Sequence, residues 1–351
     1  MPFFNREEDI RRMKAVLSGE PNLVYFVYGP INSGKTALLM KVAEELPKDY
    51  VVFYINFRWR DVERVEDLVR VLFEVEYGKG REEFKEVVKD VLKTGAKGVG
   101  KIKGIPIPEK IFDYLFGGAK KVEDIFKYLE KVFELVVEEK YKPVLILDEM
   151  QTRKEVVNSA GKPVISGLFN FLVGMTKEKH LCHVLCSTSD CLFIEDLYSN
   201  AHLEGRAEYI LIDDLEKDKA FRVYEAFAFE DKFLVWNYIG GKIGDMVRLF
   251  ERKKQGYSER EASERMFEDQ AARFRWMLRL LEESEKEGPP VEEVKEVLKM
   301  FKKNKEVEDI KIKSKVLKFL LEENVLFYNP VKGIVRPQSQ LLYRAMIELL
   351  K

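Results

Sequence analysis

Short apolar runs alternate with amphipathic stretches through residues 1–215 of this 351-residue chain. Runs that are rich in Val, Ile, Leu and Tyr and apolar at nearly every position predict strands buried on both faces. These runs are Leu23–Tyr28, Tyr50–Phe57, Pro143–Leu147, His183–Ser187 and Tyr209–Ile212. The stretches with helical spacing between them are Lys35–Glu45, Val65–Phe73, Arg81–Leu92, Val122–Glu139 and Ile165–Met175. The alternation predicts an α/β fold in which helices cover a parallel sheet.

The spacing of apolar positions becomes helical throughout residues 216–287, which end in the long charged stretch Ser258–Glu287. A Gly-Pro-Pro break at 288–290 follows. Beyond the break we predict two helices, a hairpin and a last helix, which are Val291–Lys302, Ser314–Glu323, Val325–Tyr328, Ile334–Arg336 and Gln340–Leu350. This order is typical of a winged helix. We therefore expect a sheet domain (1–215), a helical lid (216–287) and a winged-helix-like domain (288–351).

One segment interrupts the alternation of predicted strands and helices in the sheet domain. Thr94–Pro108 reads TGAKGVGKIKGIPIP and is rich in Gly, Lys and Pro, which predicts a loop or hinge. We favour a plain linker over the alternative, a cationic lid above the site.

The charge is balanced, with 60 Lys and Arg against 61 Asp and Glu, which argues against coating of nucleic acid by bulk charge. No apolar run approaches the roughly 20 residues of a membrane helix, and the N-terminus lacks the pattern of a signal peptide. We expect a soluble, cytoplasmic protein without a membrane partner. The bias toward Lys and Glu resembles the composition of hyperthermophile proteins.

The segment Gly29–Thr36 reads GPINSGKT and matches the phosphate-loop pattern GxxxxGK(S/T) at every position. It follows a predicted strand and opens a predicted helix, which is the context that such a loop needs. The loop amides would face the phosphates of ATP, Lys35 would neutralise phosphate charge, and Thr36 would bind Mg²⁺. The expected nucleotide-binding residues are Gly29, Pro30, Ile31, Asn32, Ser33, Gly34, Lys35 and Thr36.

An acidic pair follows the apolar run Pro143–Leu147. Asp148 is expected to hold Mg²⁺, and the adjacent Glu149 to orient and deprotonate the attacking water, as in a Walker B strand. The Asp-Glu pair also indicates the P-loop subclass with an extra strand between the loop strand and the acidic strand. Tyr50–Phe57 is the run that we expect to supply this extra strand.

Two more polar features are candidates for contact with the γ-phosphate. The run HVLCSTSD ends in hydroxyl groups at 187–189, which either sense the phosphate or cap a turn. Arg206 precedes the last predicted strand and either reaches the phosphate, within the chain or from a neighbouring subunit, or is an ordinary surface residue. We take Ser187 and Arg206, with Lys35 and Glu149, as candidate catalytic residues.

All three cysteines and two of the three histidines fall within His180–Cys191. A zinc site is one interpretation, but Cys182 and Cys186 alternate on a predicted buried strand and no CxxC spacing occurs. We therefore favour small apolar core residues. A Cys186–Cys191 bridge is an alternative for a hyperthermophile source.

These motifs together resemble the archaeal ATPase family, a STAND-like branch of the P-loop ATPases that is related to the AAA+ class. FFNREEDI (Phe3–Ile10), LILDEMQ (Leu145–Gln151) and the pair Gly205-Arg206 are similar to boxes of that family, as is the phosphate loop. The resemblance implies a sheet domain, a helical lid and a C-terminal winged helix, with ATP and Mg²⁺ as ligands.

The resemblance also implies roles for residues outside the phosphate loop. Asn5, Arg6 and Glu7 would stand near the nucleotide base, and Arg6 is taken as a binding residue. NYIGGKIGDM (Asn237–Met246) resembles the family's GG-x-P segment in the lid, but Ile243 stands in the place of the proline that would contact the nucleotide.

Three hypotheses about function follow. The first is a slow, Mg²⁺-dependent ATPase that acts as a regulatory switch on an unknown protein partner, with nucleotide-dependent homo-oligomers as a further expectation. The second is an ATPase similar to origin-recognition proteins, because residues 289–351 carry 13 Lys and Arg against 9 Asp and Glu (13 − 9 = +4). In that case Lys311, Lys313, Lys315 and Lys318 would bind duplex DNA through the winged helix. The third is a nucleotide-locked scaffold without useful turnover.

Overall fold

A six-stranded parallel sheet forms the centre of the computed structural model. The structure describes residues 6–59, 71–76, 101–108, 122–150, 162–198, 203–283 and 285–350. The strand order is β4-β2-β6-β7-β1-β8. The strands are β1 (Val24–Tyr28), β2 (Tyr50–Asn56), β4 (Lys101–Lys103), β6 (Lys142–Asp148), β7 (His183–Thr188) and β8 (Ala207–Leu211).

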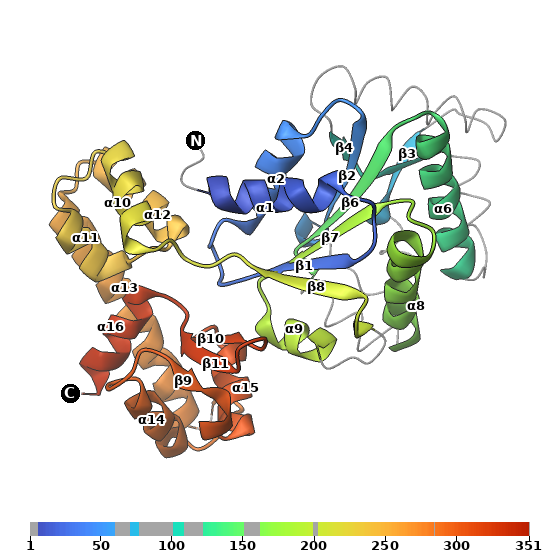
Figure 1. Ribbon diagram of the computed structural model, residues 1–351. Coiled ribbons are helices and arrows are strands. Elements are labelled where there is room, and N and C mark those ends of the chain that lie inside the picture. The colour runs from blue at the N-terminus through green and yellow to red at the C-terminus, as the bar shows by residue number, and fades with distance from the viewer. Residues whose placement is uncertain are drawn as a thin grey trace.

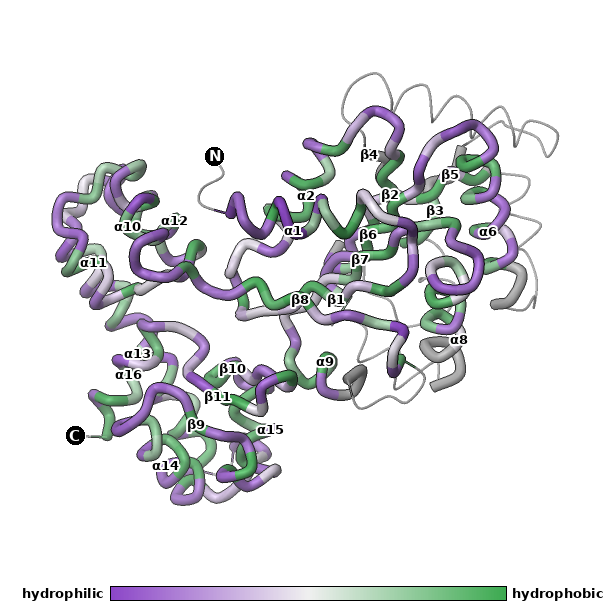
Figure 2. Tube along the Cα trace, viewed as in Figure 1, coloured by the Kyte–Doolittle hydropathy of each residue, from purple (hydrophilic) through white to green (hydrophobic). Residues whose placement is uncertain are grey.

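Helices cover both faces of the sheet, as the continuous apolar runs predict (Figures 1 and 2). Helices α1 (Glu7–Ser18) and α2 (Lys35–Glu45) pack on the face that Val52 and Ile146 present. The opposite face is covered by α6 (Val122–Glu138), α8 (Lys162–Val173) with the π-turn η4 (Gly174–Glu178), and α9 (Cys191–Tyr198). The α/β fold class is thereby confirmed.

The extra strand is present, but Tyr50–Phe57 does not supply it. Strand β7 lies between β1 and β6, whereas β2 pairs with the outer side of β6, so that expectation is wrong. The candidate strands are equally apolar and each pairs through backbone groups. Apolarity therefore could not decide which of them stands next to the loop strand.

The linker expected at Thr94–Pro108 is also wrong over its second half. Strand β4 extends the main sheet, and β5 (Ile105–Pro108) pairs with β3 (Phe73–Glu76) in a separate two-stranded sheet. Ile105 and Ile107 are fully buried, and the Tyr128 hydroxyl donates to the carbonyl of Pro106. Ile105 and Ile107 each precede a proline, and a residue in that position prefers an extended backbone. The Ile-Pro-Ile-Pro sequence therefore favours a strand. Residues 94–100 lie outside the described residues.

Two predicted helices of this region are only partly testable. Of Val65–Phe73 the structure describes residues 71–73, and Phe73 already begins strand β3. Arg81–Leu92 lies outside the described residues.

The lid is helical. Helices α10 (Lys217–Ala226), α11 (Lys232–Ile239), α12 (Ile243–Lys254) and α13 (Glu259–Glu282) follow the sheet (Figure 1). They enclose an apolar core of their own around the fully buried Tyr224. A capping box between Ser258 and Glu261 begins α13.

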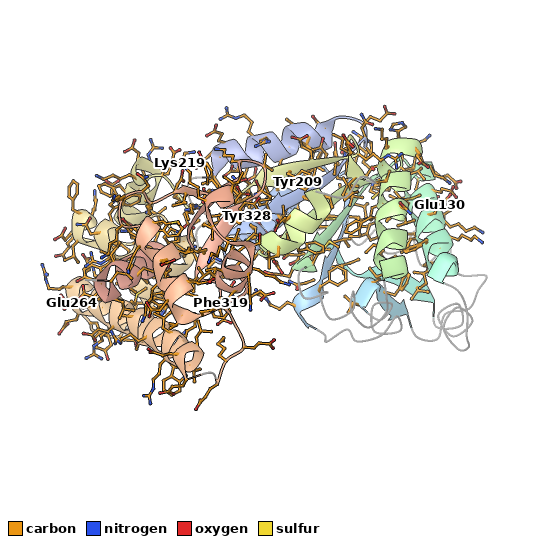
Figure 3. The ribbon with its side chains drawn as sticks, turned by 90° about the horizontal axis from the view of Figure 1, so that it is seen from below. Glu130, Tyr209, Lys219, Glu264, Phe319 and Tyr328 are labelled. Atoms are coloured by element: carbon orange, nitrogen blue, oxygen red, sulfur yellow. The ribbon has the colours of Figure 1, made fainter. Side chains whose placement is uncertain are left out.

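The C-terminal module has the element order of a winged helix. Its helices are α14 (Val291–Met300), η6 (Asp309–Lys311), α15 (Ser314–Glu322) and α16 (Gln340–Leu349), and its strands are β9 (Val307–Glu308), β10 (Leu326–Asn329) and β11 (Ile334–Pro337). The antiparallel sheet has the order β10-β11-β9. Strand β9 is absent from the sequence prediction because two residues are too short for a periodic signal. Figure 3 shows Tyr328 of β10 where the module meets the sheet domain.

The cysteines are core residues. Cys182, Cys186 and Cys191 are buried and none of the three is in a disulfide bridge, and burial raises the pKa of the Cys182 and Cys186 thiols. No group of three or more His, Cys, Asp or Glu residues among the described residues could hold a metal ion. No helix of the described chain is long and apolar enough to cross a membrane.

Candidate nucleotide site

The loop Gly29–Thr36 connects the end of β1 to the start of α2, as predicted. A Cβ on Gly29 would lie 2.1 Å from the backbone oxygen of Ile212, so no side chain fits at this position. Gly34 adopts φ = +95°, which L-residues rarely adopt. The glycines of the motif are therefore required by the path of the backbone.

Lys35 lies within the loop and is only 5% exposed. Its Nζ donates to the carbonyls of Gly29, at 3.0 Å, and Pro30, at 2.9 Å. Desolvation by burial lowers the pKa of Lys35 to about 8, although the nearby carboxylates of Glu149 and Asp148 oppose this shift. An ammonium that is poorly hydrated and faces the loop is well placed to bind phosphate oxygens.

Asp148 and Thr36 form the candidate Mg²⁺ site. The Thr36 hydroxyl donates to Oδ2 of Asp148 at 2.8 Å, and the carboxylate is fully buried. Hydroxyl and carboxylate oxygens are ligands that Mg²⁺ accepts together with substrate phosphates and water. The donor set therefore fits the ion.

Tyr54 and Asn56, at the end of β2, complete the surroundings of Asp148. The Tyr54 hydroxyl donates to the same Oδ2 of Asp148 at 2.7 Å, and Nδ2 of Asn56 lies 3.1 Å from the Tyr54 hydroxyl oxygen. Burial and the neighbouring carboxylate raise the pKa of Tyr54, which keeps this donor protonated. The sequence analysis did not identify these residues, although their spacing of two on a strand places them on one face.

Glu149 turns out of the sheet with φ = +61°, a left-handed conformation that costs about 1–3 kcal/mol for a residue with a side chain. Its Oε1 lies 3.1 Å from Nη2 of Arg58, in the short helix η1 (Phe57–Trp59) that follows β2. The arginine side chain is 65% exposed and the glutamate side chain 9% exposed, so Arg58 pairs with this carboxylate from the solvent side.

The hydroxyls at the tip of β7 divide into two groups. Ser187 and Thr188 are buried within the strand, each 1% exposed. Ser189, one residue further, lines the same cavity as Lys35 and Glu149. The geometry therefore brings Ser189 to the site and holds Ser187 in the core.

A cavity of about 770 Å³ unites the loop, the acidic strand and the lid. Its lining comprises Ile31, Asn32, Gly34, Lys35, Thr36, Ala37, Asn56, Arg58, Glu149, Ser189, Ile243 and Gly244. The volume lies within the range of about 300–1,000 Å³ that small-molecule sites occupy.

The lid touches the loop directly. The Gly244 amide donates to the carbonyl of Asn32 at 3.1 Å, and Lys242 Nζ donates to the carbonyl of Ile31 at 2.9 Å. Ile243, which stands where the family pattern has proline, lines the cavity beside Gly34. Ile243 therefore brings an apolar side chain of the lid to the cavity.

Arg6 lies behind the loop and is not among the residues that line the cavity. Its Nη2 donates to the carbonyls of Ser33, at 2.8 Å, and Asp213, at 2.5 Å, and it also pairs with Asp9 at 3.1 Å. Asn5 lies outside the described residues, and Glu7 is exposed at the start of α1. Arg6 thus joins the loop to the segment that leaves β8.

Arg206 is far from the loop in the same chain, so a contact in cis is wrong. It immediately precedes β8, where Ala207 pairs with Val24 at the first residue of β1, whereas the loop follows the last residue, Tyr28. At roughly 3.3 Å per residue, the strand separates them by about 13 Å. A contact from a neighbouring copy stays a prediction.

Two family profiles match successive parts of the chain. One, described as an ATPase domain predominantly from Archaea, matches residues 3–249. The other, described as the C-terminal domain of an uncharacterized MJ1010-like ATP-binding protein, matches residues 260–350. The second match begins within α13.

Relatives align over the full chain. The uncharacterized ATP-binding protein MJ0147 of Methanocaldococcus jannaschii is 39% identical and covers 100% of this chain and 98% of its own. The ATP-binding protein MJECL15 of the same organism is 38% identical, with 100% of both chains covered. The Walker-type ATPase PABY2304 of Pyrococcus abyssi has a TM-score of 0.64 at 15% identity, covering 98% of this chain and 96% of its own, which shows a shared fold.

The protonation of Lys35 predicts how binding depends on pH. Below pH 8 the ammonium is charged and binds phosphate, whereas above pH 8 it loses its proton, so affinity for ATP should fall by about tenfold between pH 7 and pH 9. Calorimetric titration with a non-hydrolysable ATP analogue measures this. Lys35→Arg is the control, because guanidinium stays charged and its affinity should not vary over this range. A wild-type affinity that is equally flat would contradict the assignment.

Proposed function

Because the chain belongs to the ATPase family found predominantly in archaea, whose relatives are ATP-binding proteins, we propose that it is an ATP-driven switch. In this proposal Mg²⁺-ATP binds between the loop and the lid and is hydrolysed slowly. The nucleotide state then controls whether the C-terminal module stays docked on the sheet domain or is free for a protein partner.

The residues of the cavity support this chemistry. Lys35 and the loop amides would stabilise the charge that develops on the transferred phosphate. Thr36 and Asp148 would hold Mg²⁺, which neutralises phosphate charge when it is bound. Glu149 would accept the proton of the attacking water, and Ser189 is the hydroxyl placed to contact the γ-phosphate.

The observation that carries the switch is a bond between the module and the strand that leads into the loop. The Tyr28 hydroxyl donates to Oδ1 of Asn329 at 2.9 Å, in a buried contact between the residue before Gly29 and the end of β10. A second link pairs Arg336 of β11 with Asp213, beyond β8. The module therefore contacts both sides of the loop's base.

The segment 213–215, which contains Asp213, also contacts the lid. Asp214 pairs with Lys242 at 3.2 Å, and the Leu215 amide donates to the carbonyl of Gly241 at 2.8 Å. Movement of the loop on nucleotide binding would thus reach the lid and the module through 213–215. A switch needs such a shared element.

The lysines of the DNA hypothesis are partly neutralised. Lys311, Lys313 and Lys318 pair with Glu308, Glu293 and Glu322. Helix α15 also contacts α9 of the sheet domain. Binding of duplex DNA stays a prediction, and we favour a protein partner.

Turnover tests the hydrolytic step. The wild-type chain should release phosphate from Mg²⁺-ATP slowly, and Glu149→Gln should lower kcat about 100-fold or more because the general base is lost, while ATP still binds. Phosphate release and analogue binding are measured together, with and without duplex DNA. Glu296→Gln, at an exposed position of α14, is the matched control.

Equal turnover of the Glu149 variant and the wild type would contradict this assignment of the base. Turnover that duplex DNA stimulates, in a manner that falls with salt, would favour the nucleic-acid hypothesis.

The Arg58–Glu149 pair predicts a brake on turnover. The 3.1 Å ion pair occupies the Glu149 carboxylate, which would otherwise be available to the attacking water, so Arg58→Gln should raise kcat several-fold at unchanged affinity. Arg58→Lys, which preserves the charge, should stay near the wild-type rate. A fall in kcat for the Gln variant would instead place Arg58 among the groups that stabilise the transition state.

The docking contacts predict a link between release of the module and affinity. Asn329→Ala with Arg336→Gln should increase the radius of gyration and lower the affinity for an ATP analogue several-fold, because the docked module helps to hold Asp213, whose carbonyl accepts from the same Arg6 that binds the loop carbonyl of Ser33. Small-angle scattering and calorimetry measure the two effects. Lys332→Gln, on the exposed turn beside Asn329, is the control. An expanded chain with unchanged affinity would show that docking and ATP binding are independent.

A further inference from the structure

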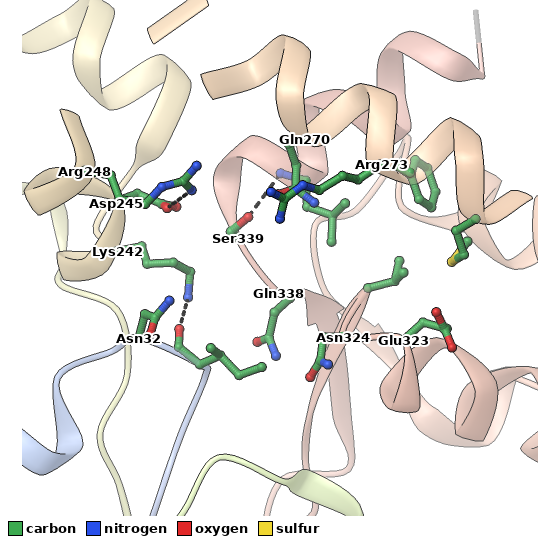
Figure 4. A pocket seen from close by; sticks show the side chains of 15 residues that line it. Asn32, Lys242, Asp245, Arg248, Gln270, Arg273, Glu323, Asn324, Gln338 and Ser339 are labelled. Carbon is green, nitrogen blue, oxygen red and sulfur yellow. Dashed lines mark hydrogen bonds and ion pairs between the residues drawn. The ribbon is translucent and has the colours of Figure 1, made fainter. Parts of the chain in front are cut away.

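A second cavity lies where the loop, the lid, α13 and the C-terminal module meet (Figure 4). Its volume is about 420 Å³. Its polar lining comes from all four parts: Asn32, Lys242, Asp245, Arg248, Gln270, Arg273, Glu323, Asn324, Gln338 and Ser339. The ATP hydrolysis proposed above uses none of these side chains.

The two cavities are separate. They share only Ile31 and Asn32 among their lining residues. Between them the lid closes on the loop, since a Cβ on Gly244 would lie 2.5 Å from Cβ of Asn32. A molecule in the second cavity would therefore not contact Lys35 or Thr36.

Gln338 is the side chain in this cavity that most directly indicates a ligand. It is 7% exposed, and its Oε1 has no hydrogen-bond partner in the described structure. A buried acceptor left unpaired costs about 1–3 kcal/mol, which a ligand that donates a hydrogen bond would recover. A side-chain amide also binds adenine in two places, because its oxygen accepts from the amino group while its nitrogen donates to the ring.

The remaining lining suits an anion that carries a planar ring. Lys242, Arg248 and Arg273 line the cavity with Asp245 and Glu323 (3 − 2 = 1). Arg248 pairs with Asp245 and Lys242 with Asp214, each at 3.2 Å, whereas Arg273 makes no ion pair within the described residues. Guanidinium groups match the geometry of phosphate oxygens. The apolar wall against which a ring could lie consists of Ile31, Phe274, Met277, Val325 and Leu342.

We propose that this cavity binds a second ligand, an adenine mononucleotide, with its base at Gln338 and its phosphate at Arg273 and Arg248. The volume of about 420 Å³ is within the range of small-ligand sites. Because the site is complete only while lid and module are docked on the loop, the ligand stabilises the docked arrangement. This consequence rests on the proposed switch, whereas binding itself does not.

The probe is AMP, which lacks the β- and γ-phosphates that the loop would bind. Calorimetric titration of the full chain should give the same affinity for the wild type and Lys35→Ala, because the loop is not used. Arg273→Ala and Gln338→Leu should each weaken AMP at least tenfold. Arg275→Ala, at an exposed position of the same helix outside the cavity, is the matched control and should bind as the wild type does.

Loss of AMP binding in Lys35→Ala would assign the ligand to the loop site and overturn the proposal. No binding at millimolar AMP, or affinities unchanged in both cavity variants, would overturn it as well. Arg273 is exposed, so its substitution leaves the fold intact and keeps the test meaningful if Gln338→Leu misfolds. ATP turnover is measured on the same samples, so failure of the second site is distinguishable from failure of the hydrolytic proposal.

Discussion

The three parts of the molecule depend on one close passage of the backbone. Ile212 carbonyl oxygen approaches Gly29 so closely that a Cβ there would lie 2.1 Å away, and Leu215 carbonyl oxygen would lie 1.8 Å from a Cβ on Gly241. The four residues 212–215 thus run between the phosphate loop and the lid, and they leave no room for a side chain at Gly29 or Gly241. Because steric exclusion at this distance is far steeper than any attraction, the two glycines fix the geometry on which the weaker polar contacts rely.

Charge adds a second layer to this arrangement. Lys35, Asp148, Glu149 and Lys242 are all nearly buried, which is unfavourable for ions unless they are paired. The chain keeps them close to one another, so partial compensation lets them remain inside. Lys35 shows that compensation is incomplete, because burial lowers its pKa to about 8 despite the neighbouring carboxylates of Glu149, Asp148 and Asp214. Because the positive charge of Lys35 is not fully compensated by the protein, the site is suited to an anionic ligand.

The sequence was sufficient to predict those parts of the site whose residues are neighbours along the chain. The phosphate loop and the pair Asp148-Glu149 each lie in one short segment, and neighbouring strands and helices confirm their context. It was insufficient where contacts join distant segments, as with Tyr54 on Asp148 or Lys242 on the carbonyl of Ile31. The spacing along the chain does not encode which strands become neighbours. Strand β5 at 105–108 shows a related limit. Its Gly- and Pro-rich surroundings predicted a loop from composition, but its two isoleucines alternate with the prolines and are both buried.

The contacts behind the loop explain how its amides can be prepared for phosphate. In a trans peptide unit the carbonyl and the following N–H point in opposite directions. Lys242 binds the carbonyl of Ile31 and Arg6 binds that of Ser33, so each cation also orients the amide of the next residue, Asn32 or Gly34. One of these cations belongs to the lid and the other shares Asp213 with the C-terminal module through Arg336. Displacing either part would therefore release a loop amide, and binding of phosphate would in turn depend on where lid and module stand.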